Sequence, residues 1–392
     1  MPMSRPTSRW TAGWAPRRTS ARARGGRAGT ALAGVLAAAL LAGCGLGGSR
    51  DAGGGQRDAG GQGATGTSTK ALPAPDPTRC PAGAGQSGGG QDAGGAPGPG
   101  RDRAPRGPFL VDPRSQAAQV AAANPATAQA IAPLVQTPTA FPVGDWLTDV
   151  TGEVRSRTAA ATASGSTAVF MIYAIPHRDV AAGFSAGGLP DAGAYRQFTR
   201  QVAAGIGAAR AVLVLEPDAL GQIDELAPGQ AAERYVLLRD AVDVYASLPA
   251  TSVYLDGANC GWIAPGEMAR RLAQAGVAHA RGFAVNVANY YRTGDEVSRA
   301  EIVAGLLGGA HYVVDTSRNG RGPASGLANA WCNPPGRGLG IRPTTETGYP
   351  HADAFLWVKT PGASDGECGR GDPSAGTWWQ RAATDLVRNA SE

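Results

Sequence analysis

Residues 211–218, Ala-Val-Leu-Val-Leu-Glu-Pro-Asp, join an unbroken run of five aliphatic side chains to two carboxyl groups. A short continuous aliphatic run is typical of a strand buried on both faces, as in a parallel sheet. Pro217 fixes its own backbone and donates no hydrogen bond, so the polar residues beside it begin a loop. The stretch therefore predicts a buried parallel strand with carboxyl groups at its C-terminal end.

The same pattern recurs through the second half of the chain. Short apolar runs alternate with longer helical stretches, as in parallel strands joined by crossover helices. The predicted strands are Val169–Tyr173, Ala211–Leu215, Ser252–Leu255, Gly282–Val285, Tyr312–Val314 and Ala354–Val358, with a weaker candidate at Asp145–Leu147. The predicted helices are Tyr195–Ala208, Ala231–Leu248, Pro265–Ala275, Arg299–Leu307 and Trp378–Asn389. This order predicts an α/β fold, a parallel barrel of seven or eight strands.

Polar residues follow the predicted strands, and carboxylates cluster among them. They include Asp179, Glu216, Asp218, Asp256, Asp315 and Asp365. In an α/β barrel the active site lies at this C-terminal rim. The chain has four His, and its His and Cys residues lack the spacing of metal ligands. The rim therefore indicates general acid and base chemistry on a neutral substrate, and we expect no cofactor.

An aspartate after a strand often caps a helix or closes a turn, and Asp256 and Asp315 taken singly are open to that interpretation. Asp218 differs because it follows an apolar strand and Pro217, which stiffens the backbone. Apolar surroundings raise the pKa of a carboxyl group. We therefore predict that Asp218 is catalytic.

The N-terminal residues 1–43 are predicted to be an export signal. They hold seven Arg and no acid, followed by an apolar run, Thr30–Leu41, that is short for a membrane span. The run ends in Leu41-Ala42-Gly43-Cys44, which resembles a bacterial lipobox. We expect a lipid on Cys44 and a location on the outer face of the cell membrane, with later release left open. Without the seven Arg the net charge of +5 becomes −2, which argues against a nucleic-acid partner.

Residues 44–107 are predicted to be a disordered linker, and residues 108–392 the folded domain. The stretch 45–107 holds 20 Gly and 7 Pro and no aromatic residue, so it cannot bury a core. If Cys44 is lipidated, Cys80, Cys260, Cys332 and Cys368 remain, and three pairings are possible. Cys332 and Cys368 follow successive strands, which favours their pairing, while the partners of Cys80 and Cys260 stay open.

Several motifs in residues 108–392 together resemble glycoside hydrolase family 6, the inverting cellulases. Two strings look like the family signatures, Tyr-Ala-Ile-Pro-His-Arg-Asp at 173–179 and Val-Leu-Glu-Pro-Asp-Ala-Leu at 214–220. Further motifs follow in the family's order at 254–257, 286–290, 315–320, 331–337 and 357–365. The resemblance implies a distorted barrel of about seven strands that hydrolyses β-1,4-glucosidic bonds of cellulose or related β-glucans with inversion. Short loops indicate an open cleft and endo action.

The resemblance also implies roles for single residues. Asp218 matches the general acid, Asp179 the aspartate that keeps this acid protonated and helps to place or activate water, and Asp365 the residue most often proposed as the base, a role that is disputed in the family. Substrate contacts are implied for Tyr173, Trp146, Asp256, Asn259, Trp262, Asn289, Trp331 and Lys359. Cys332 and Cys368 match the family's second disulfide.

Three positions depart from the family pattern. Val180 stands where a disulfide cysteine is usual, Asn259 where His is common, and Ala363 where Glu is common. We therefore expect weaker activity on long-chain cellulose or a shifted preference.

Other functions fit parts of the sequence. A lipid-anchored protein that binds oligosaccharides without hydrolysis, or a cellobiohydrolase, would share many of these features. Gly183-Phe184-Ser185-Ala186-Gly187 has the G-x-S-x-G form of a serine hydrolase, but no predicted strand directly precedes it. We expect a monomer whose partners are a β-1,4-glucan or cello-oligosaccharide and, through Cys44, the membrane.

Overall fold

The computed structural model of the chain describes residues 98, 100–181 and 183–390. The predicted export signal, Cys44 and the linker up to residue 97 lie outside the described residues. Among the described residues, no helix is both long enough and apolar enough to cross a bilayer.

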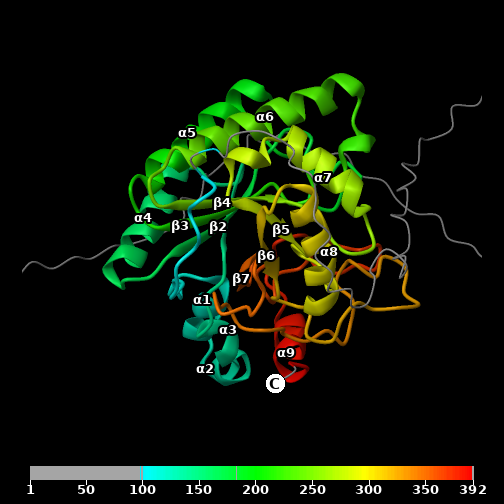
Figure 1. Cartoon of the computed structure of the whole chain (residues 1–392). Helices are drawn as coiled ribbons and strands as arrows, with labels where there is room; N and C mark the ends of the chain where they lie inside the picture. The colour runs from blue at the N-terminus through cyan, green and yellow to red at the C-terminus, as the bar shows by residue number, and fades with distance from the viewer. Residues whose placement is uncertain (1–97, 99, 182, 391–392) are drawn as a thin grey trace, which may run out of the picture. The chain divides into compact units, whose positions relative to one another are not determined.

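The described residues form one sheet of seven parallel strands, arranged in the order of the sequence (Figure 1). The strands are β1 (Phe141–Gly144), β2 (Ala168–Tyr173), β3 (Ala211–Leu215), β4 (Thr251–Asp256), β5 (Gly282–Val285), β6 (His311–Asp315) and β7 (Ala352–Leu356). The N–H of Ala140, before β1, donates to the carbonyl of Trp357, after β7, at 2.9 Å. This hydrogen bond joins the segments next to the two outer strands, so the curled sheet forms the distorted barrel that was predicted.

Five helices cross over on the outside of the sheet (Figure 1). They are α4 (Val150–Ala163), α5 (Ala192–Ile206), α6 (Pro228–Ala246), α7 (Pro265–Gln274) and α8 (Thr293–Leu306). A second group comprises α1 (Gln116–Ala123), α2 (Pro125–Ala128), α3 (Ala132–Val135) and α9 (Gln380–Arg388). Ala117, Leu134 and Leu386 of this group share a small core with Trp357, so the two ends of the folded chain cover the place where β1 and β7 meet.

Side chains of β3 show why this strand is apolar throughout. Ala211, Leu213 and Leu215 pack against the helices, whereas the alternate residues Val212 and Val214 fill the interior of the barrel. Successive side chains of a strand point to opposite faces, so a strand buried on both faces has no polar position. The interior is therefore a packed core, and a binding site can form only at the ends of the strands.

Six predicted strands are confirmed within one or two residues at each end, and the weak candidate at Asp145–Leu147 is wrong. The first strand is β1, a few residues earlier, and Pro142 in its middle hid it. β1 pairs only with β2, and proline is tolerated in such an outer strand. Helix α4 was also missed, because its sequence alternates small and polar residues with no clear apolar stripe.

The packed chain begins before the boundary expected at residue 108. The N–H of Gly98 donates to the carbonyl of Ala278 at 3.2 Å, and Arg281 Nη1 donates to the carbonyl of Arg101 at 2.6 Å. A Cβ on Gly100 would lie 2.3 Å from the carbonyl oxygen of His279, so only glycine permits this approach. Composition suggested a linker here because backbone hydrogen bonds leave no apolar signal in the sequence.

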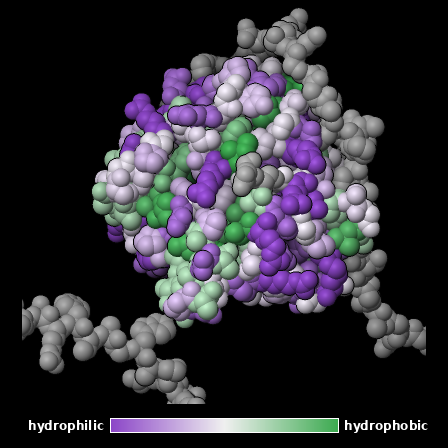
Figure 2. Space-filling view, turned by 90° about the horizontal axis from the view of Figure 1, so that it is seen from below, coloured by the Kyte–Doolittle hydropathy of each residue, from purple (hydrophilic) through white to green (hydrophobic). Residues whose placement is uncertain are grey.

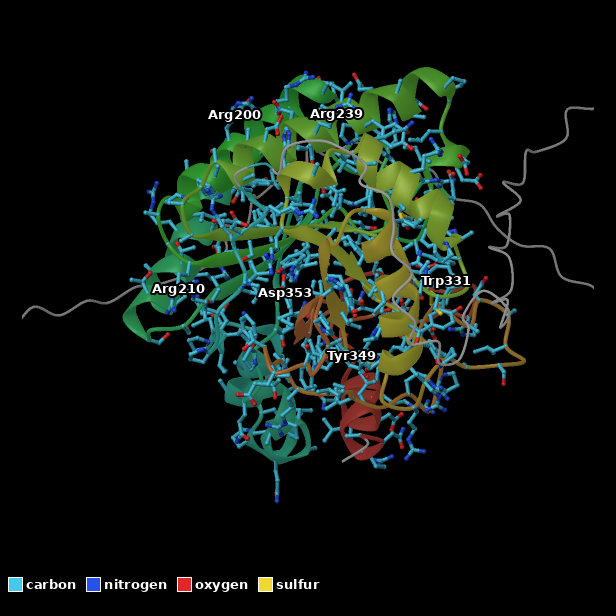
Figure 3. All side chains as sticks on the ribbon, viewed as in Figure 1. Arg200, Arg210, Arg239, Trp331, Tyr349 and Asp353 are labelled. Carbon is cyan, nitrogen blue, oxygen red and sulfur yellow. A yellow bond between two sulfur atoms is a disulfide. The ribbon has the colours of Figure 1, made fainter. Side chains whose placement is uncertain are left out.

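Ionic contacts tie the N-terminal ends of the strands together. Asp353 of β7 accepts from Arg281 at 2.7 and 2.8 Å and from the hydroxyl of Tyr254 at 2.6 Å, and Figure 3 labels it among the strands. Such contacts at this end of a barrel serve stability rather than catalysis.

The face seen in Figure 2 carries hydrophobic residues in separate small areas between hydrophilic ones.

Candidate active site

A pocket of ≈ 140 Å³ lies at the C-terminal ends of the strands. Most of the predicted site residues line it, namely Tyr173, Asp179, Asp218, Asn259, Trp262, Asn289, Trp331, Lys359 and Asp365. Trp146 and Asp256 do not line the pocket. The fold thus brings together the three carboxyl groups expected to be catalytic from the ends of β2, β3 and β7.

Asp218 is held at the pocket by a strained turn. Glu216 and Asp218, on either side of Pro217, have left-handed backbones with φ of 50° and 69°, a conformation that costs free energy and is common at functional sites. The N–H of Asp218 donates to Asp256 Oδ2 at 3.0 Å. Burial raises the pKa of the Asp218 carboxyl well above its usual value, and the charges of Asp256 and then Asp179 raise it further. Each of these effects favours the protonated, acid form of Asp218.

Asp179 also has a left-handed backbone, with φ of 53°. Its Oδ2 accepts from the N–H of Ser185 at 2.6 Å, and its Oδ1 accepts from the Gln222 side chain at 3.2 Å. Ser185 and Gln222 line the pocket, yet the sequence gave no reason to assign them there. Both donors are neutral, so they orient the carboxyl group of Asp179 without pairing its charge.

Asp365 is surrounded by cations. Arg318 Nη1 lies 3.0 and 2.9 Å from its two oxygens, and Lys359 Nζ lies 2.9 Å from Oδ1. The hydroxyl of Tyr290 and the N–H of Asn333 also donate to Oδ2, at 3.1 and 3.0 Å. Burial alone would raise the pKa of Asp365, but the charges of Arg318 and Lys359 outweigh it and hold the pKa well below its usual value. Asp365 is therefore a permanent carboxylate.

Asp256 lies behind the pocket and not in its wall. It is 2 % exposed, and its Oδ2 accepts from the backbone N–H groups of Asp218 and Ala258 at 3.0 and 3.2 Å. These contacts give Asp256 a positioning role in place of the expected substrate contact. Burial raises its pKa to about 7.

Asp315 is saturated by backbone donors. Its Oδ2 accepts from the N–H groups of Ala288 and Lys359, each at 3.0 Å, and its Oδ1 from Ser317 and Val358 at 2.9 and 3.2 Å. These donors belong to the segments that follow β5, β6 and β7. Of the two interpretations that the sequence left open for Asp315, the structure supports the structural one.

Aromatic side chains surround the three carboxyl groups. Trp262 and Trp331 line the pocket, and the Trp331 ring lies 5.8 Å from that of Phe184 between centroids. Trp331 Nε1 is buried without a hydrogen-bond partner among the described residues, so it is a donor that a sugar hydroxyl could satisfy. Trp146 is half exposed outside the pocket, with the Arg178 guanidinium 5.4 Å from its ring centre. An exposed ring there suits a more distant sugar unit.

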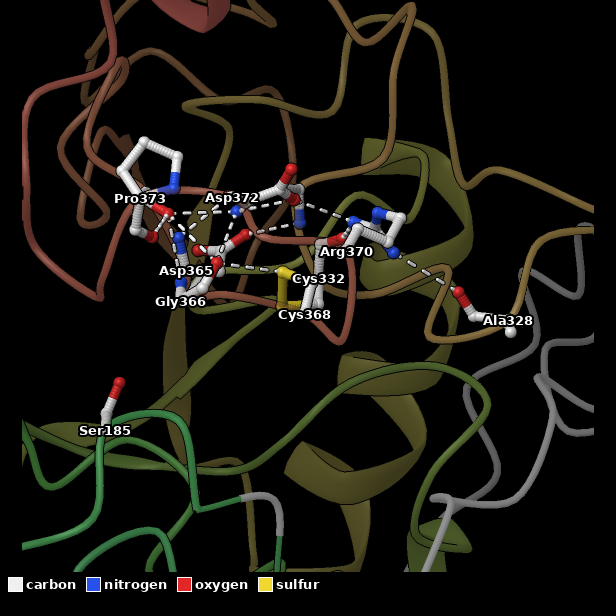
Figure 4. The surroundings of a disulfide bond; sticks show 12 residues. Ser185, Ala328, Cys332, Asp365, Gly366, Cys368, Arg370, Asp372 and Pro373 are labelled. Carbon is white, nitrogen blue, oxygen red and sulfur yellow. Dashed lines mark hydrogen bonds and ion pairs between the residues drawn. A yellow bond between two sulfur atoms is a disulfide. The ribbon is translucent and has the colours of Figure 1, made fainter. Parts of the chain in front are cut away.

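The disulfide between Cys332 and Cys368 is confirmed, with 5.7 Å between the Cα atoms. It joins the segment that carries Trp331 to the loop that carries Asp365. Figure 4 shows Asp365 close to the disulfide, and Ser185 across from them on the loop after β2. Cys80 lies outside the described residues, so its pairing stays open.

The G-x-S-x-G interpretation is wrong. Ser185 lies in a loop closed by hydrogen bonds between the backbones of Arg178 and Gly187, with no strand directly before it and no helix directly after it. The nucleophile of a serine hydrolase needs both of these elements. No group of three metal-ligating side chains occurs among residues 98, 100–181 and 183–390.

Comparison with known proteins gives one consistent result. The family model described as Glycosyl hydrolases family 6 matches residues 106–390. Endoglucanase A of Cellulomonas fimi is 38 % identical over 289 residues, which cover 73 % of this chain and 62 % of that protein. Endoglucanase 1 of Streptomyces halstedii is 38 % identical over 289 residues, which cover 71 % of this chain and 88 % of that protein. The chain thus spans only about three fifths of the length of some curated relatives.

Solved structures agree with the sequence matches. The endoglucanase Cel6 of Mycobacterium tuberculosis, in complex with methyl-cellobiosyl-4-deoxy-4-thio-β-D-cellobioside, is 42 % identical with a TM-score of 0.70, covering 74 % of this chain and 98 % of that chain. The catalytic core of the cellobiohydrolase Cel6A of Chaetomium thermophilum is 26 % identical with a TM-score of 0.63, covering 75 % of this chain and 99 % of that chain. Since the family model, the relatives and the seven-stranded fold with its three aspartates all agree, this chain belongs to glycosyl hydrolases family 6.

Proposed function

We propose that this chain hydrolyses β-1,4-glucosidic bonds of cellulose-type glucans with inversion, cutting within the glucan chain. The observation that carries the proposal is that two carboxyl groups of one pocket have opposite electrostatic surroundings. Burial and neighbouring carboxylates keep Asp218 protonated, whereas Arg318 and Lys359 keep Asp365 ionised. An acid beside a fixed anion is what glycoside hydrolysis requires, because the leaving oxygen needs a proton and the sugar ring becomes positive.

Each carboxyl group then has its own task. Asp218 donates its proton to the leaving glycosidic oxygen. The fixed charge of Asp365 stabilises the positive charge that develops on the sugar ring. A group with such a low pKa binds a proton weakly, so Asp365 is a poor acceptor for the proton of the attacking water. Asp179 has no ion pair among the described residues. We propose that it accepts the proton of the attacking water, either directly or through a second water molecule.

The endo mode is supported by the relatives. Four relatives named endoglucanases are 38–43 % identical, whereas four named cellobiohydrolases are 32–34 % identical. One observation favours cellobiohydrolase action as a second candidate. The contact between Phe184 and Trp331 brings the loop after β2 against the segment between β6 and β7, and loops that meet above a site restrict entry to chain ends.

Product analysis separates these functions. The full chain is incubated with carboxymethylcellulose, mixed-linkage glucan and cello-oligosaccharides. Endo action predicts that the viscosity of carboxymethylcellulose falls early, while few reducing ends have formed. Release of cellobiose with little loss of viscosity would support the second candidate, and binding of cello-oligosaccharides without any product would leave only a binding protein.

We also propose that the protein is exported and anchored in the membrane by a lipid on Cys44. The support is the Arg-rich leader and the Leu-Ala-Gly-Cys sequence at 41–44. Cys44→Ser should leave the protein unprocessed or release it from the membrane fraction, and unchanged attachment of this variant would refute the anchor.

A further inference from the structure

A cluster of buried charged side chains contains Asp256 together with Glu296 and Arg299, two residues that have no part in the mechanism above. Glu296 and Arg299, three residues apart in α8, are both fully buried, and Asp256 at the end of β4 is 2 % exposed. Charged side chains are rarely buried to this extent unless they are paired. A cluster of this kind beside a catalytic turn therefore needs an explanation.

Each member of the cluster has one contact that fixes a segment of the active site. Asp256 Oδ2 accepts from the N–H of Asp218, and Glu296 Oε1 accepts from the N–H of Cys260 at 2.7 Å. Arg299 Nη2 donates to the carbonyl of Ile263 at 3.1 Å. Helix α8 thus holds the segment after β4, which carries Asn259 and Trp262 of the pocket.

The remaining polar atoms of the cluster are complementary to one another. Asp256 Oδ1, Glu296 Oε2, and Arg299 Nε and Nη1 are buried without a hydrogen-bond partner in the described part of the chain. They are two acceptor atoms and two donor nitrogens. Buried polar atoms are nearly always satisfied, and internal water commonly does this where protein partners do not reach. These four atoms are the polar groups of the cluster that the protein leaves for internal water to satisfy.

We infer that Arg299 is a positioning residue, whose buried guanidinium keeps Asp256 ionised against the backbone of Asp218 and thereby keeps Asp218 in its acid form. The inference rests on the proposed function only in treating Asp218 as the catalytic acid. Glu296 supports the arrangement by holding the Cys260 backbone beside the guanidinium.

The electrostatic effects on the pKa values of Asp256 and Asp218 have the signs that this role of Arg299 requires. Burial raises the pKa of Asp256 to about 7; the backbone N–H groups of Asp218 and Ala258 oppose this rise, and so does Arg299, the nearby cation. Burial and then the charge of Asp256 raise the pKa of Asp218. Arg299 is not among the main charges that act on Asp218 itself, so its influence passes through Asp256. The other charged groups that face these two carboxyls are Asp179, Lys359 and Asp365 around Asp218, and Glu296 and Asp315 around Asp256.

The test removes the cation and measures the protonation of Asp218. In Arg299→Met, Asp256 should become neutral, so the pKa of Asp218 should fall by about one unit in ¹³C NMR of the labelled Asp carboxyl groups, with Asp218→Asn used for assignment. The alkaline limb of kcat/KM on cellotetraose should move to lower pH by a similar amount, because that limb reports loss of the proton from the acid. The acidic limb should not move. Arg299→Lys keeps the charge and should restore both values towards those of the wild type.

A double-mutant cycle shows whether Asp256 carries the effect. Asp256→Asn alone should lower the pKa of Asp218 as Arg299→Met does, and adding Arg299→Met to it should lower the pKa no further. Arg157→Met is a matched control, because Arg157 is also buried but pairs with Asp112 and Glu153. It should lower stability without moving either limb.

Two failures are distinguishable. An unchanged Asp218 pKa in folded Arg299→Met, or a further fall in the double variant, would overturn the role of Arg299. If the wild-type chain cleaved no glucan but the pKa of Asp218 still fell in Arg299→Met, the proposed function would be refuted and this inference would stand.

Discussion

Asp218 and Asp365 are both buried carboxyl groups of one pocket, yet their surroundings set opposite protonation states. Burial raises the pKa of Asp218 and neighbouring carboxylates raise it further, whereas Asp365 touches Arg318 and Lys359, whose charges lower its pKa against the effect of burial. Two titratable groups whose pKa values are driven apart in this way identify the acid and the anion of a site. The division of tasks therefore follows from neighbours and not from the residue type.

The first prediction concerns the acid. Asp218→Asn keeps the shape of the side chain and the backbone N–H that donates to Asp256, but it removes the transferable proton. Hydrolysis of unactivated cellotetraose should fall by about 10²- to 10⁴-fold. Calorimetry should show that cellotetraose still binds.

Asp240→Asn is the control for this change. Asp240 lies on α6 and pairs with exposed Arg200 away from the pocket, so the variant should keep nearly all activity. If Asp218→Asn kept more than about a tenth of the wild-type rate, general acid catalysis by Asp218 would be excluded.

The sequence predicted part of the site at this scale. Asp218 was found because Pro217 and the aliphatic strand are local signals. Ser185, Gln222 and Arg318 were given no role, because each acts through a contact with a distant residue. Arg318 and Asp365, for example, lie 47 positions apart. A short sequence pattern contains no information on such a pair.

At the scale of elements, polar side chains at the strand ends join each strand to its neighbour. Glu216 at the end of β3 accepts from the N–H groups of Ala174 and Ile175 after β2, and Asn286 after β5 donates to the carbonyl of Asp315 in β6. The hydroxyl of Tyr195 in α5 also donates to Glu216, at 3.0 Å. These contacts fix the rim from which the catalytic side chains project.

The second prediction uses the titration of Glu216. Burial raises its pKa to about 7, against roughly 4.3 in an unfolded chain. The folded chain therefore binds this proton more tightly, so the stabilisation is complete below pH of about 4.3 and is lost as the pH rises through 7. Urea denaturation of the wild type should give a lower free energy of unfolding at pH 8 than at pH 5.

Glu216→Gln should show a smaller difference between the two pH values, because the amide does not titrate. It should also be less stable at pH 5, by about 1–3 kcal/mol, since the amide NH₂ replaces an acceptor that faces backbone donors. Glu225→Gln changes an exposed residue and should behave as the wild type does. Equal pH dependence in Glu216→Gln and the wild type would show that Glu216 is not the titrating group.

Elements with a strong pattern were predictable and those with a weak one were not. Strands β2, β3 and β5 are apolar throughout and β4, β6 and β7 contain shorter apolar runs, and β3 has the predicted bounds, Ala211–Leu215. β1 contains Pro142, and α4 begins with Asp149 as its cap but lacks an apolar stripe. Both depend on tertiary packing, which a local pattern does not report.

At the scale of the whole molecule, the two ends of the folded chain meet where β1 approaches β7. The hydrogen bond from Ala140 to Trp357 and the small core around Trp357 join these ends. The curled sheet then directs the ends of β2, β3 and β7 to one pocket, so Asp179, Asp218 and Asp365 converge although 186 positions separate the first from the last. The curled arrangement of the strands produces this site.

The proposed mechanism is a direct displacement by water, with Asp218 as the acid and no covalent link between the sugar and the protein. Proton NMR of cellotetraose during the first minutes of hydrolysis by the full chain measures this directly, because the anomeric signals of fresh product appear before mutarotation. The inverting mechanism predicts that the new reducing end is first the α-anomer. A β-anomeric first product would contradict it, because retention requires a covalent glycosyl intermediate and a nucleophilic carboxylate.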